Sequence, residues 1–116
     1  MTSYLNLNII FIMITKNEIL KNLELLNKKY KDKGFKISSL FGSYARGTQD
    51  KFSDIDLTYS INHNIFYKDN AFAKLAKIEE IKLELEKKFH TKVDLIPMNT
   101  KNRYIQESLE KEQVLV

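Results

Sequence analysis

Two aspartates near the middle of the chain carry the clearest chemical signal. Asp54 and Asp56 are separated by one residue, and apolar and polar residues alternate from Asp54 to Ile61, which is typical of a strand with one buried face. Both side chains are therefore expected on one face, with Cα atoms about 6.5 to 7 Å apart. A metal ion or an arginine would neutralise such a pair, and carboxylate oxygens at this spacing favour a site for hard divalent cations.

A glycine-serine turn precedes the aspartates. The segment 35–41 reads as a strand, and Gly42 interrupts it where the backbone needs a positive φ or a close approach to a ligand. Ser43 is expected to open a short helix. Its hydroxyl and the N–H groups of the first turn would form an anion site suited to a triphosphate, a role compatible with simple helix capping by serine.

Asp94 and Arg46 complete the candidate site. Asp94 lies in the short alternating run 92–96, where Val93 and Leu95 face the opposite way, so it is a candidate third metal ligand; the alternative is an exposed carboxylate on an edge strand. Arg46 has two open roles. It could contact a phosphate, or it could pair with a nearby acid such as Asp54 or Asp56.

On these residues the sequence resembles the minimal nucleotidyltransferases of the DNA polymerase β superfamily, which include MntA-type antitoxins of HEPN toxin–antitoxin pairs. The resemblance rests on Gly42-Ser43, ten intervening residues, Asp54-Ile55-Asp56 and the later Asp94, and it covers the chain from about residue 15 onward. It implies transfer of AMP from ATP with release of pyrophosphate. The residues it assigns as metal ligands for two Mg²⁺ ions and as catalytic groups are Asp54, Asp56 and Asp94, and those it assigns to ATP are Gly42, Ser43 and Arg46.

The size of the chain bears on the acceptor of the AMP group. A chain of 116 residues can close one core but lacks room for the acceptor-binding domain of larger nucleotidyltransferases. The expected acceptor is therefore a hydroxyl of a docked protein, such as a tyrosine of a HEPN-domain toxin. Two alternatives remain open: an antitoxin that acts by binding alone, and an enzyme that modifies a small molecule or an RNA end.

Composition excludes several classes of site. Without cysteine there is neither a disulfide framework nor a thiolate metal site, and a cytoplasmic location is expected. The net charge of +4 favours phosphates or an acidic partner, yet no aromatic-basic RNA-binding motif is present, so direct nucleic-acid binding is not expected. The apolar stretch 4–14 is too short to span a bilayer, so no membrane association is expected.

The remaining pattern predicts an α/β domain over residues 15–116, with a small mixed β-sheet packed by α-helices, in agreement with the polymerase β-like fold. Helices are expected at 16–33, opened by a capping box at Thr15 and stopped by Gly34, and at 103–111. A long helix with its core stripe is expected between them, and the tail 114–116 is expected to pack on the domain or on a partner. The stripe comprises Phe72, Leu75, Ile78, Ile81, Leu85 and Phe89.

Residues 1–14 read as an N-terminal extension of uncertain role. Met13 directly precedes the capping box, so it is a candidate for the natural start of the protein. The extension is equally compatible with an added leader, an edge strand or a partner-binding segment.

Overall fold

A computed structural model describes residues 14–116, so the predicted extension lies almost wholly outside the described residues. The elements in chain order are α2 (Lys16–Tyr30), the 3-10 turn η1 (Lys31–Lys33), β1 (Phe35–Phe41), α3 (Ser43–Arg46), β2 (Ile55–Ile61), α4 (Ala71–Phe89), β3 (Val93–Pro97), α5 (Arg103–Glu112) and β4 (Val114–Leu115).

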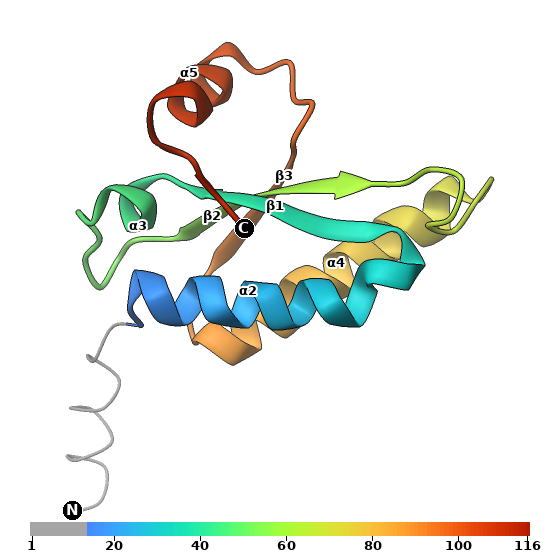
Figure 1. The fold of residues 1–116 in the computed structure, drawn as a ribbon, viewed down its shortest axis with the longest axis horizontal. Helices are drawn as coiled ribbons and strands as arrows, with labels where there is room; N and C mark the ends of the chain where they lie inside the picture. Colours follow the sequence, from blue (N-terminus) through green and yellow to red (C-terminus); the bar gives the residue numbers. More distant parts are fainter. Residues whose placement is uncertain (1–13) are drawn as a thin grey trace, which may run out of the picture.

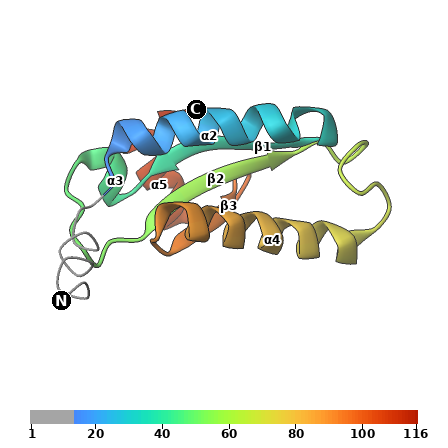
Figure 2. The same cartoon turned by 90° about the horizontal axis from the view of Figure 1, so that it is seen from below.

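The four strands form one mixed sheet in the order β3-β2-β1-β4. Strand β1 is antiparallel to β2 and β4, whereas β2 and β3 are parallel. Helices α2 and α4 cover one face of the sheet, and α5 lies on the other (Figures 1 and 2). The predicted α/β fold with a small mixed sheet is confirmed.

Helix α2 forms as its sequence predicts. The Thr15 hydroxyl accepts a hydrogen bond from the Glu18 N–H at 3.2 Å, which caps the helix. The apolar stripe of the helix is buried in the core, and Gly34 ends the following turn in the left-handed conformation with φ of 81°. The stripe comprises Ile19, Leu23, Leu26 and Tyr30.

Helix α4 departs from the prediction at its N-terminal end. Ile81, Leu85 and Phe89 are buried, but Phe72 and Leu75 are 83% and 69% exposed, so their assignment to the core was wrong. The helix packs mainly on β3, which has five residues against the 19 of the helix. At about 3.3 Å per strand residue and 1.5 Å per helix residue, that strand is too short to cover the first turns of α4.

A β-bulge in β1 decides which face the end of this strand presents. Ile37 lies opposite Tyr59, but the next paired residue is Ser39, opposite Thr58, so Ser38 is the extra residue. The Ser39 and Thr58 hydroxyls form a buried hydrogen bond of 2.6 Å. Beyond the bulge, Phe41 lies opposite Asp56, which brings the following turn to the candidate site.

The C-terminal tail packs on the domain, as expected, by adding β4 to the edge of β1. Its last residue, Val116, donates a backbone hydrogen bond of 3.0 Å to the Ser38 carbonyl. Within residues 14–116, no helix combines the length and apolar character needed to cross a membrane.

Candidate active site

Gly42 brings the end of β1 directly against Asp56. Its backbone has φ of 77° and ψ of −157°, which strongly favours glycine, and it is the N-cap of α3. A Cβ atom added to Gly42 would collide with Oδ2 of Asp56. The predicted turn glycine is therefore required by conformation and by the close approach of this carboxylate.

Asp56 and Asp94 are directly paired residues of the parallel strands β2 and β3. The pKa of Asp56 is raised to about 6, chiefly by burial and then by the charge of Asp94 and hydrogen bonding with it. The negative charge of Asp54 acts in the same direction, whereas the Arg46 charge partly offsets these effects. The fold thus brings two of the three predicted carboxylates together across the sheet.

Asp54 occupies a less regular position than predicted. Strand β2 begins at Ile55, so Asp54 lies just before the strand, half-buried, and acts on Asp56 through its charge. In the part of the chain that the structure describes, no group of three or more His, Asp or Glu side chains is arranged to hold a metal ion. The three-carboxylate set therefore stays a prediction.

The donor set nevertheless fits a hard divalent cation. Asp56 and Asp94 offer carboxylate oxygens from adjacent strands, and oxygen is the ligand that Mg²⁺ prefers. A cation would also relieve the electrostatic cost that raises the pKa of Asp56. The chemistry of this pair is consistent with the predicted metal site.

Helix α3 is a single short turn held in place at both ends. Ser43 begins it as predicted, and Gly47 ends it with φ of 77°. The Lys16 ammonium donates a hydrogen bond of 3.2 Å to the Ala45 carbonyl, which ties α2 to the turn. Tyr44 is only 2% exposed within the core, so its ring is not available to stack on a base.

Arg46 pairs with an acid that the sequence pattern did not identify. Its guanidinium Nη1 donates to Oε1 and Oε2 of Glu112 at 2.9 and 2.8 Å. Glu112 ends α5, so the pair joins the motif helix to the C-terminal segment. The partner is thus neither Asp54 nor Asp56, and no local spacing signals a contact between segments so far apart in the chain.

Comparison with known proteins identifies the family. Residues 21–116 match the family model "Polymerase beta, Nucleotidyltransferase". Over 102 residues the chain is 34% identical to the Methanocaldococcus jannaschii protein named "Putative protein adenylyltransferase MJ1379", covering 87% of this chain and 93% of that protein.

Two solved structures share the fold. One described as "Structure of putative minimal nucleotidyltransferase" has a TM-score of 0.64 and 21% identity, over 89% of this chain and 97% of that one. A toxin–antitoxin crystal structure with AMP-PNP has a TM-score of 0.56 and 22% identity, over 81% of this chain and 71% of that one. With the family match over most of its length, the chain belongs to the polymerase β-type nucleotidyltransferases.

Proposed function

We propose that this nucleotidyltransferase is a Mg²⁺-dependent protein adenylyltransferase that moves AMP from ATP to a hydroxyl of a partner toxin and thereby acts as its antitoxin. The observation that carries the proposal is the pairing of Asp56 with Asp94 directly beside the Gly42 turn. A protein that acted by binding alone would gain nothing from holding two repelling carboxylates in this position.

The proposed ATP site combines this pair with the start of α3. The Gly42 N-cap supplies no side-chain hydrogen bond, so the N–H groups of the first turn and the Ser43 hydroxyl would bind the triphosphate. Asp54, Asp56 and Asp94 would hold two Mg²⁺ ions, which when bound offset phosphate charge and lower the pKa of the attacking hydroxyl. Arg46 would release Glu112 and donate hydrogen bonds to a phosphate of ATP instead.

The acceptor is proposed from the proteins that this chain resembles. In this proposal the acceptor hydroxyl would arrive on a docked protein. Relatives at 34% identity are named as putative protein adenylyltransferases, and a structural neighbour is a toxin–antitoxin complex with an ATP analogue. A tyrosine of a HEPN-domain toxin is the proposed target.

Mass spectrometry tests this proposal. A candidate HEPN-domain toxin, incubated with this chain, ATP and Mg²⁺, should gain mass in AMP increments. The Asp54→Asn/Asp56→Asn variant should abolish these increments, because each change removes a charged ligand and nearly keeps the side-chain shape. If the folded double variant still relieved toxicity in cells as well as the parent, binding alone would be the better account.

A further inference from the structure

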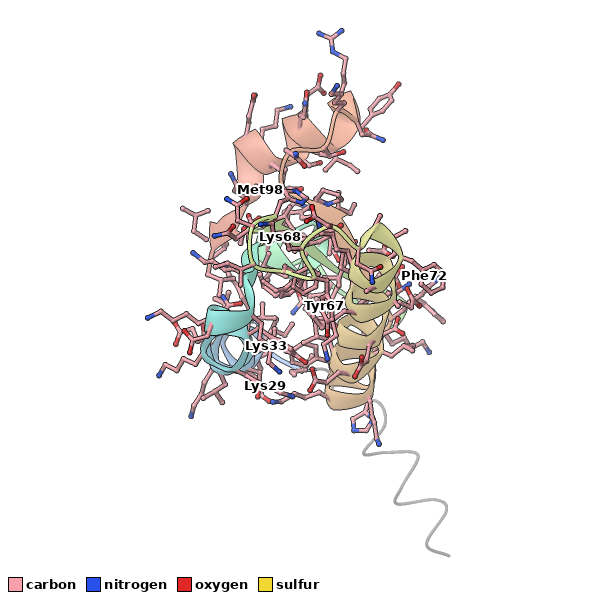
Figure 3. The ribbon with its side chains drawn as sticks, turned by 90° about the vertical axis from the view of Figure 1, so that its right-hand side faces the viewer. Lys29, Lys33, Tyr67, Lys68, Phe72 and Met98 are labelled. Carbon is pink, nitrogen blue, oxygen red and sulfur yellow. The ribbon has the colours of Figure 1, made fainter. Side chains whose placement is uncertain are left out.

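A groove between α2 and α4 is separate from the residues of the nucleotide site. It encloses about 430 Å³, and its walls carry Lys29 and Lys33 on one side and Lys77 and Lys87 on the other. We call it the lysine groove. The two helices run antiparallel side by side (Figure 2), and Lys29 and Lys33 lie at the space between them (Figure 3).

Three ammonium groups gather around one aromatic ring in this groove. The Nζ atoms of Lys29, Lys33 and Lys77 lie 5.2, 5.6 and 5.5 Å from the centroid of the Tyr30 ring. Each ammonium is attracted by the ring, but the three cations repel one another. Their convergence creates a local positive potential that an anionic group would stabilise.

Two glutamates offset only part of this charge. Glu84 pairs with Lys29 at 2.6 Å, and Glu80 pairs with Lys77 at 3.3 Å. The lining contains four lysines and two glutamates, so four positive and two negative charges leave +2. Across residues 14–116, no carboxylate lies within ion-pair distance of the other two lysines.

Exposed leucines accompany the lysines on both helices. Leu83 lines the groove and is 55% exposed, and it lies one turn before Lys87 on α4. Leu25 on α2 is 51% exposed and lies one turn before Lys29. Each helix therefore offers an apolar side chain followed by a cation, which is complementary to a segment that carries both apolar and acidic side chains.

We propose that the lysine groove is a docking surface for an amphipathic helix of a protein partner, with Asp or Glu residues beside its apolar face. Helices commonly bind in grooves of this kind through apolar anchors flanked by charges. The observations favour a protein over a nucleic acid. Tyr30 is only 3% exposed, so no base can stack on it, and no arginine lines the groove.

Fluorescence anisotropy with the full chain tests this surface. The probe is a labelled synthetic helical peptide with leucines along one face and glutamates on its flanks. We expect it to bind, whereas the same peptide with lysines in place of glutamates should not. Absence of binding by the acidic peptide, or equal binding by the lysine peptide, would overturn the proposal. A labelled single-stranded RNA that bound in the same groove more tightly than the acidic peptide would also overturn it.

Two matched variants locate the peptide. Lys33→Glu/Lys87→Glu changes the two lysines that lack a carboxylate partner, and it should weaken peptide binding about tenfold or more. Lys21→Glu/Lys88→Glu alters the net charge equally, at exposed positions of α2 and α4 outside the groove, and it should have a much smaller effect. If both double variants weakened peptide binding equally, the effect would come from the net charge of the protein, and the groove would be rejected as the binding site.

Further measurements distinguish a loss of peptide binding at the groove from misfolding of the variants, and keep this test independent of the proposed enzyme activity. Should the glutamate variant melt early, Lys33→Gln/Lys87→Gln tests the same cations with a smaller perturbation. ATP affinity should be unchanged in both variants, because neither lysine belongs to the nucleotide site. Amide shifts that the peptide induces only outside α2, η1 and α4 would place the surface elsewhere, whatever the outcome of the AMP-transfer assay.

Discussion

Asp56 and Asp94 are register partners on adjacent parallel strands, although they lie far apart in the sequence. The pKa of Asp56 is raised to about 6 by burial and by its neighbour, so ionising Asp56 at neutral pH opposes folding. Under the proposed function, a cation bound by these carboxylates would offset that cost.

Replacing Asp56 with asparagine should stabilise the protein without ligands at neutral pH. Because the folded pKa exceeds the ordinary value of 3.8, stability is lost as the pH rises from about 4 to about 6, and the full loss persists above pH 6. Discounted for a half-buried side chain, the effect is about 1 kcal/mol, or about 4 °C in Tm.

Thermal melts at two pH values check this sign. Asp56→Asn should melt above the parent at pH 7.5 and together with it at pH 3.5. The exposed Asp32→Asn variant is the control and should show no comparable gain. A lower melting temperature for Asp56→Asn at pH 7.5 would contradict the proposed electrostatic cost.

Binding of ATP should depend on a divalent cation. We expect calorimetry to show tighter ATP binding with Mg²⁺ or Mn²⁺ than in EDTA, because Asp56 and Asp94 would hold a cation whose charge offsets that of the phosphates. Asp56→Asn/Asp94→Asn should remove most of this difference. Equal ATP affinity with and without metal in the parent would reject the site as described.

Two glycines provide a matched test of the turn. Gly47→Ala should cost about 1 kcal/mol of stability, since φ is 77° but nothing lies within 4 Å of the added Cβ. Gly42→Ala combines a similar φ with a collision against Asp56, so it should cost more, about 2 to 3 kcal/mol, and abolish AMP transfer. Denaturant unfolding gives the stability of both variants. Equal losses of stability would show that Asp56 moves away from the added Cβ at no cost in free energy.

The Arg46–Glu112 pair allows the two roles of Arg46 to be separated. Glu112→Gln removes the charge of the carboxylate whose two oxygens accept from Arg46 Nη1, and because Arg46 is half-exposed the stability cost should be about 1 kcal/mol or less. If Arg46 binds phosphate, this variant should raise ATP affinity, whereas Arg46→Gln should lower it. Calorimetry with ATP on both variants distinguishes the two roles. Unchanged ATP affinity in both variants would leave Arg46 with a structural role alone.

Removing residues 1–12 should leave a folded and active protein. The capping hydrogen bond at Thr15 begins α2 without them, and the described core is assembled from residues 14–116. Melts and ATP binding of the shortened chain, compared with the full chain, check this expectation. A collapse in melting temperature would assign the segment 4–12 to the core.

Local spacing was sufficient to predict much of this molecule. The helix from Lys16, the turn at Gly42 and the strand after Asp54 follow from capping, backbone conformation and period-two patterning, which act over a few neighbouring residues. The fold class and the family could therefore be inferred from the sequence, whereas the roles of the site residues stay predictions.

Tertiary structure decided what local spacing does not encode. The bulge at Ser38 places Phe41 opposite Asp56, and the parallel register places Asp94 beside it. The short β3 leaves Phe72 exposed despite its place in an apolar stripe. Glu112 contacts Arg46 only because the chain brings the end of α5 close to α3. The two residues are far apart in the sequence, so no local pattern predicts their contact.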